Sequence, residues 1–181
     1  MHIILSSTIL RKPEPQDAAD LYRFRNDPEV VHALGGFSSG YSLRDIEEWI
    51  ERRRKASEDL VWTIADRETN ACLGHAGLYR IDHRVRCCEF AILIGEPART
   101  GKGLGREVSS VVIAYGFDEL NMNRIELSVI ASNIRAVRLY ESLGFVREGV
   151  KRAAQYRAGA YADVILMAML RGEWNDGKNT G

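Results

Sequence analysis

Three alternating glycines, Gly101, Gly103 and Gly105, constrain this chain more than any other feature. They lie between an apolar run at 90–94 that is typical of a buried strand and a longer segment whose apolar residues recur at helical spacing. Glycine has no Cβ, so the backbone can turn sharply here and expose its N–H groups, and the start of the next helix offers further unpaired amides to an anion. The junction therefore predicts a phosphate-binding loop, formed by Thr100, Gly101, Lys102, Gly103, Leu104 and Gly105.

The spacing of these glycines excludes the two commonest phosphate loops. A dinucleotide-binding fingerprint needs a third glycine at a position that Arg106 or Val108 fills. A Walker loop needs Ser or Thr directly after Gly-Lys, where this chain has Gly103. A glycine-rich turn without a ligand remains the alternative interpretation of this motif on its own.

The segment 133–145 predicts a short helix, with Ser132 or Asn133 as its cap and Gly144 at its end. Asn133 and Tyr140 are seven residues apart and share one face of this helix. A rise of 1.5 Å per residue places the amide and the phenol about 10 Å apart, a span that suits an elongated ligand. The alternative is that Tyr140 packs in the core and Asn133 only caps the helix.

Together the two segments resemble the GNAT superfamily of acyl-CoA-dependent N-acetyltransferases. The superfamily's helix pattern Asn-x-x-Ala-x-x-x-Tyr-x-x-x-Gly-Phe is filled here by Asn133, Ala136, Tyr140, Gly144 and Phe145. In its loop pattern Gln/Arg-x-x-Gly-x-Gly/Ala, Thr100 occupies the Gln/Arg position and Arg99 stands one place earlier. The segments 10–13, 25–28 and 159–167 are similar to the branch that contains ribosomal-protein N-terminal, polyamine and amino-sugar acetyltransferases, so the resemblance covers nearly the whole chain.

The resemblance implies a GNAT fold whose strands splay apart at the acyl-CoA site, with acetyl-CoA as co-substrate. It places the pyrophosphate on residues 101–105 and the pantetheine against the backbone of Leu93, Ile94 and Gly95, and it adds Asn133 and Tyr140 to the residues that contact CoA. It assigns Tyr140 as proton donor to the leaving thiolate. It also implies that the first two helices, the loop at 30–42 and the segment 155–163 enclose the acceptor.

Transfer of an acyl group to an amine needs a base as well as an acid, because a protonated amine has no lone pair with which to attack. Tyr140, with an ordinary pKa near 10, suits the acid. The best candidate base is Glu89, because the apolar run around it is expected to raise the pKa of a carboxylate. The alternatives for Glu89 are an ion pair, an edge-strand charge, or a ligand of the amine.

The order of elements predicts an α/β protein with one mixed sheet flanked by helices on both faces. At 181 residues and 45% hydrophobic, the chain fits one domain over residues 1–174, with a disordered tail at 175–181. We expect strands at 8–12, 60–65, 73–81, 86–94, 125–129, 145–149 and 164–170, and helices at 16–25, 43–56, 104–120 and 134–143.

Composition excludes several classes of partner. The 25 basic and 25 acidic residues give a formal net charge of zero, so we expect neither nucleic acid nor a membrane surface as a partner. The chain lacks an apolar run long enough for a membrane span and lacks a signal-peptide pattern, which favours the cytoplasm. Cys72, Cys87 and Cys88 have no zinc-ligand spacing, so we expect them to be reduced and structural and expect no metal.

The expected function is therefore transfer of an acetyl group from acetyl-CoA to a primary amine of a small molecule or a protein N-terminus. The alternative from another class is a catalytically silent acyl-CoA sensor or scaffold. The sequence leaves the identity of the amine, the length of the acyl group and the oligomeric state open, with transfer of a longer acyl group and a homodimer among the options.

Overall fold

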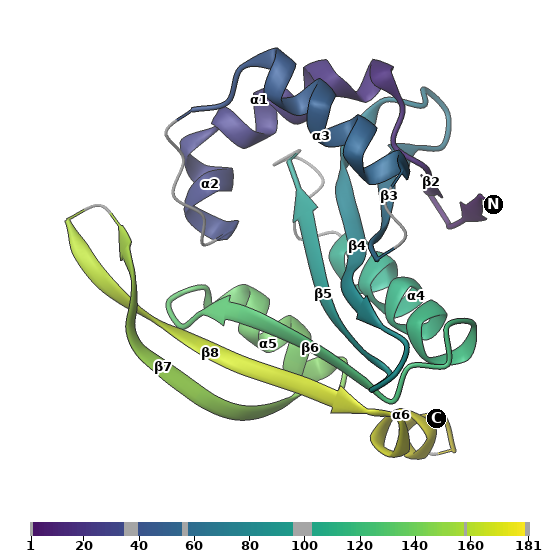
Figure 1. The fold of residues 1–181 in the computed structure, drawn as a ribbon, viewed down its shortest axis with the longest axis vertical. Coiled ribbons are helices and arrows are strands. Elements are labelled where there is room, and N and C mark those ends of the chain that lie inside the picture. Colours follow the sequence, from purple (N-terminus) through teal and green to yellow (C-terminus); the bar gives the residue numbers. More distant parts are fainter. Residues whose placement is uncertain (1, 35–39, 56–57, 96–102, 158, 180–181) are drawn as a thin grey trace.

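The computed structural model describes residues 2–34, 40–55, 58–95, 103–157 and 159–179 (Figure 1). The strands are β1 (Ile3–Ile4), β2 (Thr8–Arg11), β3 (Leu60–Asp66), β4 (Cys72–Asp82), β5 (Cys87–Ile94), β6 (Arg124–Ile130), β7 (Val146–Arg157) and β8 (Ala160–Leu170). The helices are η1 (Pro15–Asp17, a single 3₁₀ turn), α1 (Ala18–Asn26), α2 (Pro28–Leu34), α3 (Leu43–Lys55), α4 (Leu104–Asp118), α5 (Ile134–Ser142) and α6 (Arg171–Asn179).

The strands form one mixed sheet, in the order β1-β2-β3-β4-β5-β6-β8-β7. All neighbouring pairs are antiparallel except β5 and β6, which run parallel. This arrangement confirms the predicted single mixed sheet of an α/β protein.

The parallel pair β5–β6 separates after a short contact. The two strands are in register only from Cys87 with Arg124 to Glu89 with Glu126. Beyond that point β5 stays bonded to β4 and β6 stays bonded to β8, so the inner edges of both strands are left open. Figure 1 shows the resulting V between β5 and β6, which confirms the predicted splay.

Helices cover both faces of the sheet, as predicted. On one face Phe90 of β5 packs in a core with α4 and α5, to which Val108 and Val137 contribute. On the other face Leu93 packs under α1 and α3 with Phe24 and Ile50. Neighbouring residues of β5 alternate between the faces, which is why one strand serves both cores.

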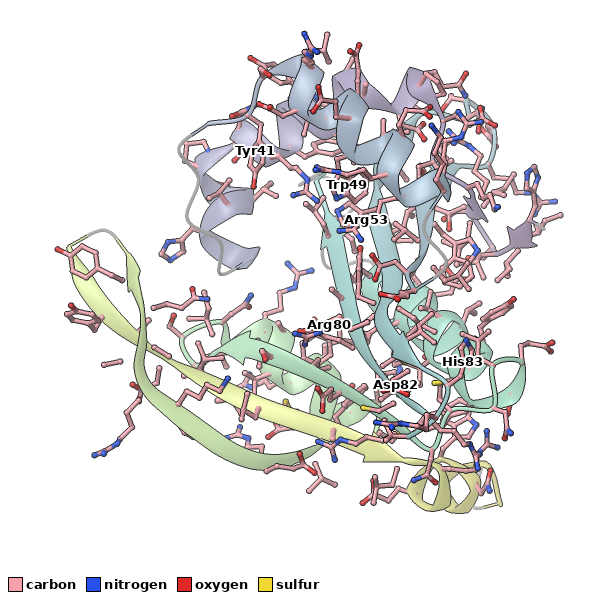
Figure 2. The ribbon with its side chains drawn as sticks, viewed as in Figure 1. Tyr41, Trp49, Arg53, Arg80, Asp82 and His83 are labelled. Carbon is pink, nitrogen blue, oxygen red and sulfur yellow. The ribbon has the colours of Figure 1, made fainter. Side chains whose placement is uncertain are left out.

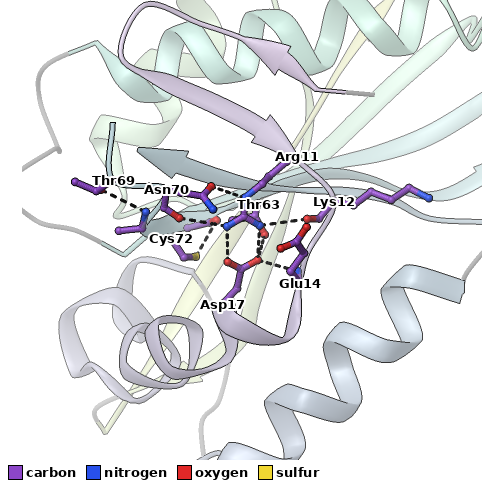
Figure 3. A network of polar contacts seen from close by, with 10 residues as sticks. Arg11, Lys12, Glu14, Asp17, Thr63, Thr69, Asn70 and Cys72 are labelled. Carbon is purple, nitrogen blue, oxygen red and sulfur yellow. Dashed lines mark hydrogen bonds and ion pairs between the residues drawn. The ribbon is translucent and has the colours of Figure 1, made fainter. Parts of the chain in front are cut away.

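A buried ion pair attaches the start of α1 to the sheet (Figure 3). The guanidinium of Arg11 donates to both carboxylate oxygens of Asp17 at 2.9 and 2.7 Å, and both side chains are at most 4% exposed. Thr63 of β3 donates to the same carboxylate at 2.8 Å, and Asn70 accepts from Arg11 Nε at 2.9 Å. Because nearly every polar atom of the pair has a partner, this network fixes where α1 begins relative to β2 and β3.

Several segments differ from the sequence-based expectation. Helix α2 occupies the first part of the expected loop at 30–42, because the carboxylate of Asp27 accepts the N–H groups of Glu29 and Val30 and so caps a helix. Strands β7 and β8 are longer than expected, since they pair with each other well beyond their apolar parts.

A further difference is the predicted disordered tail at 175–181. The structure instead places residues 175–179 in α6, and residues 180–181 lie outside the described part of the chain. Helix α6 is held by Trp174, whose ring stacks on Phe117 with 5.6 Å between centroids. Because Trp174 and Phe117 are far apart in the sequence, no local sequence pattern predicts this contact.

Among the described residues, no helix is both long enough and apolar enough to cross a bilayer.

Candidate active site

A cavity of about 510 Å³ lies in the V between β5 and β6. Four elements supply most of its wall: β5, β6, the first turn of α4, and α5. The lining residues are Glu89, Phe90, Ala91, Ile92, Ile94, Gly103, Gly105, Arg106, Ser128, Val129, Ile130, Asn133, Arg135, Ala136, Leu139, Tyr140 and Gln155. Six of the sequence-predicted site residues thus meet at one place: Glu89, Ile94, Gly103, Gly105, Asn133 and Tyr140.

Tyr140 projects from α5 into this cavity. Its ring packs edge-on against Phe90 and Phe145, with centroids 6.3 and 6.0 Å apart, and only 9% of the residue is exposed. Burial raises the pKa of the phenol to about 12, and the hydroxyl makes no hydrogen bond to another described residue. Tyr140 therefore keeps its proton at ordinary pH and has it free to donate.

Asn133 combines the two interpretations that the sequence left open. Its Oδ1 accepts the N–H of Ala136 at 3.1 Å, which makes it the N-cap of α5. It also lines the cavity. The cap fixes the first turn of the helix that carries Tyr140.

Gly103 is the N-cap of α4 and adopts a left-handed backbone with φ +84°. An added Cβ would meet no atom within 4 Å, so the space in front of this glycine is open. The first amides of a helix have no partner within it, and here they lie at the wall of the cavity beside Gly105. Of the other predicted loop residues, Thr100, Gly101 and Lys102 lie outside the described residues, and Leu104 is buried in the core and does not line the cavity.

The predicted backbone contacts at the end of β5 need a correction. The N–H of Gly95 donates to the carbonyl of Leu73 at 2.9 Å, so this amide is not free for a pantetheine group. Leu93 is buried beneath α1 and α3 and does not line the cavity. Ile94 does line it, and since successive backbone amides point to opposite sides of a strand, the Ile94 amide points away from β4 and toward the splay. The sequence could not show this because the bonding partner of Gly95 lies on another strand.

Glu89 lies at the point where β5 and β6 separate, but its surroundings are not the apolar ones that the sequence indicated. Its side chain is 29% exposed and forms an ion pair with Arg80 of β4 at 2.5 Å. The ion pair that the sequence left as an alternative is therefore present. The same carboxylate also lines the cavity.

Gln155 was not singled out by any motif. It projects from β7, and its Oε1 is buried without a hydrogen-bond partner among the described residues. The register of β7 and β8 shifts between Lys151 and Gln155. Its place in the cavity depends on that irregular pairing, which a sequence pattern does not reveal.

The cysteines are free thiols, as expected. Burial raises the pKa of both Cys72 and Cys88 to about 12, so neither forms a thiolate at ordinary pH, and neither lines the cavity. Within the ranges that the structure describes, no three His, Cys, Asp or Glu side chains gather in a way that could hold a metal ion.

A sheet opened by splayed parallel strands, with a helix N-terminus and a buried tyrosine in the opening, is the arrangement that the resemblance to acyl-CoA-dependent N-acetyltransferases predicts. A family model described as "Acetyltransferase (GNAT) domain" matches residues 8–146, and the chain belongs to this family.

Among curated proteins, the chain is 31% identical to the uncharacterized N-acetyltransferase p20 of Bacillus licheniformis, over 91% of this chain and 93% of that protein. It is 29% identical to the spermidine N(1)-acetyltransferase of Vibrio cholerae, over 93% of this chain and 96% of that protein. A crystal structure of spermidine N-acetyltransferase from Vibrio cholerae in complex with CoA and spermine matches with a TM-score of 0.86 and 27% identity, over 94% of this chain and 99% of that one. The GNAT fold, N-acetyltransferase activity and acetyl-CoA as co-substrate follow for this chain, as the sequence predicted.

Proposed function

We propose that this enzyme acetylates the primary amine of a small molecule by direct attack on acetyl-CoA bound in the V between β5 and β6. The amine nitrogen attacks the thioester carbonyl, the C–N bond forms and the C–S bond breaks. The amine loses one proton and the CoA thiolate gains one. The 510 Å³ cavity that contains both a glycine-capped helix start and Tyr140 is the observation that carries this proposal.

CoA would enter with its pyrophosphate at the start of α4. The open space in front of Gly103 and the unpaired first amides of α4 support this placement, together with Gly105 and the loop residues Thr100, Gly101 and Lys102. The edge of β5 at Ile94 faces the splay and suits the pantetheine amides, in place of Leu93 and Gly95. Leu104 then contributes through its backbone only, since its side chain is buried.

Tyr140 would donate a proton to the leaving thiolate. Its support is a hydroxyl that stays protonated, has no other described partner, and faces the cavity. Asn133 supports this role by fixing the first turn of α5.

Glu89 and Gln155 would receive the amine. Both line the cavity, one from β5 and one from β7. The carboxylate of Glu89 can accept the proton of the amine, and the unpartnered Oε1 of Gln155 can accept a hydrogen bond from it. The ion pair with Arg80 fixes the position of the Glu89 carboxylate.

Residues 1–174 would form one catalytic domain, with the cytoplasm as its expected location. Thiol release from acetyl-CoA, measured with a panel of primary amines, tests the proposal. We expect one class of small amine to support turnover that Tyr140→Phe lowers by about 10² to 10⁴. Absence of thiol release with every amine of the panel would reject a small-molecule amine as the acceptor.

A further inference from the structure

A cluster of cations and aromatic rings lies on the face of β4 and β5 that carries Glu89. Its members are Arg25 of α1, Trp49 and Arg53 of α3, and His75 and Tyr79 of β4. Figure 2 shows Trp49 and Arg53 between α3 and the β4–β5 pair, with Arg80 further along β4. Tyr79 is in register with Glu89, and His75 is in register with Leu93. The cluster therefore extends along β5 from Glu89 toward Leu93.

The contacts within the cluster fix the protonation of its histidine. Arg25 Nη2 donates to His75 Nε2 at 3.1 Å, and a guanidinium cannot accept, so Nε2 carries no proton. The ring proton is therefore on Nδ1, which lies 3.3 Å from the Tyr79 hydroxyl. Burial, together with Arg25 and Arg53, lowers the pKa of His75 to about 3, so His75 is neutral at pH 7.

The charges of this region do not balance. Arg53 forms an ion pair with Asp59, and Arg80 forms one with Glu89. Arg25 has no carboxylate partner within the described part of the chain; its contacts are His75 and the faces of Trp49 and Tyr41, with its guanidinium carbon 4.9 and 5.6 Å from the ring centroids. The Nε atoms of Arg25 and Arg53 are also buried without a hydrogen-bond partner. One positive charge and two buried donors thus remain unsatisfied on this face.

Few carboxylates are free to hold a polycation here. The chain has no acidic residue between Glu29 and Asp45, the stretch that includes the segment joining α2 to α3. Glu89 already pairs with Arg80, and in the proposed function it receives only the reacting amine of the acceptor.

We infer that the acceptor amine carries an anionic group, a carboxylate or a phosphate, which the guanidinium of Arg25 binds. The inference rests on the proposed function, and it places the amine at Glu89 and the anion further along β5. Glu89 and Leu93 are four residues apart on the same face, about 13 Å along the strand, and the long side chains of Arg25 and Glu89 shorten the gap that the acceptor spans. A half-buried cation without a counter-charge is costly, and a bound anion would compensate it through charge-assisted hydrogen bonds.

Matched acceptors separate the anion from the amine. The first pair is an amino acid and its amide, and the second is an amino sugar phosphate and the free amino sugar. Spermidine and spermine serve as polycationic acceptors for comparison. Thiol release from acetyl-CoA gives kcat/KM for each compound with the wild-type enzyme. We expect the anionic member of one pair to exceed its neutral partner by about 10-fold to 100-fold, and the pair that shows the preference identifies carboxylate or phosphate.

Equal values within both pairs, or higher values for polyamines than for every anionic amine, would overturn the inference while leaving an active acetyltransferase. If no amine gives thiol release, the proposed function fails, and calorimetric binding of the same pairs to the CoA-loaded protein decides the inference separately.

Arg25 variants test the residue itself. Arg25→Gln removes the charge, and we expect the ratio of kcat/KM between anionic and neutral acceptors to fall to near one. Arg25→Lys should retain part of the preference. Arg23→Gln is the matched control, because it removes an exposed arginine from the same helix. A folded Arg25→Gln protein with the full preference for anions would contradict the inference, and if that variant does not fold, the wild-type acceptor pairs still decide it.

Discussion

Glu89 and Glu126 face each other at the end of the register between β5 and β6, and beyond them the two strands separate. The cavity therefore begins where the backbone pairing of the sheet ends. The Glu89 carboxylate and open strand edges are both available at that point, because β5 bonds only to β4 and β6 only to β8 beyond it, and their inner edges have no partner strand. The opening in the sheet is thus the structural basis of the proposed active site.

Replacement of Tyr140 by phenylalanine removes one hydroxyl and leaves the ring in its contacts with Phe90 and Phe145. If Tyr140 protonates the thiolate, kcat should fall by about 10² to 10⁴ with little change in acetyl-CoA affinity. Steady-state kinetics and calorimetry measure the two effects. Tyr115→Phe is a matched control, since Tyr115 lies outside the cavity on α4. An unchanged kcat in Tyr140→Phe would reject the acid role.

Gly103→Val tests the phosphate site. The φ of +84° is unfavourable for valine, and its side chain would project into the open space where the pyrophosphate is proposed to lie. We expect acetyl-CoA affinity to fall at least about 10-fold at a stability cost of about 1–3 kcal/mol. Calorimetry on the folded variant measures this. Gly149→Val, on β7 with equal free space and no such backbone constraint, should retain affinity. Unaltered affinity in Gly103→Val would move the pyrophosphate elsewhere.

The parts of the site that sequence could predict are those encoded locally. Gly103 is recognisable because a left-handed cap favours glycine, and Gly105 because the proposed pyrophosphate contact favours a residue without Cβ. Asn133 and Tyr140 are recognisable because one short helix fixes their spacing. Glu89 was visible as a charge within an apolar run, but its ion pair was not, because Arg80 adopts a left-handed backbone next to a register shift between β4 and β5.

The parts that sequence could not predict depend on pairing between distant segments. Gln155 reaches the cavity through the irregular register of β7 against β8. The amide of Gly95 is occupied by a carbonyl on β4. Helix α2 is a different case, because Asp27 and Pro28 form an ordinary helix start that the sequence does contain.

Asp17→Asn tests the buried network that holds α1. The substitution leaves the guanidinium of Arg11 buried without its counter-charge, so we expect a loss of about 3–5 kcal/mol in the free energy of unfolding. Urea denaturation measures it. Asp20→Asn breaks the exposed pair with Arg23 on the same helix and should cost less than about 1 kcal/mol. Similar losses in the two variants would show that burial does not determine how much the Arg11–Asp17 pair contributes to the free energy of unfolding.

His75 should make stability depend on pH. Its pKa is lowered from the ordinary 6.5 to about 3 by burial, then by Arg25 and Arg53, so below pH 6.5 the unfolded chain binds a proton that the folded chain excludes. The stability that neutral His75 contributes is therefore present above pH 6.5 and lost as the pH falls toward 3.

Between pH 7 and pH 5 this contribution is about 2 kcal/mol. The free energy of unfolding, measured by urea denaturation across that range, should fall less in His75→Gln than in the wild type. His83→Gln, which changes an exposed histidine, should follow the wild type. Parallel curves for His75→Gln and the wild type would contradict the assignment of a neutral, buried His75.

Glu89→Gln separates the three roles that the structure leaves to Glu89. As the base, Glu89 should give the rate a rising limb with pH, and the nearly isosteric glutamine should lower kcat by about 10² or more without affecting CoA binding. If the carboxylate only holds the amine, the KM of the acceptor rises while kcat at saturation stays. If the pair with Arg80 is structural, the melting temperature falls instead.

Arg80→Gln is the companion variant, because it removes the ion pair and keeps the carboxylate. We expect Glu89→Gln to lose kcat and Arg80→Gln to retain most of it, and an intact kcat in Glu89→Gln at saturating acceptor would remove Glu89 from the catalytic residues.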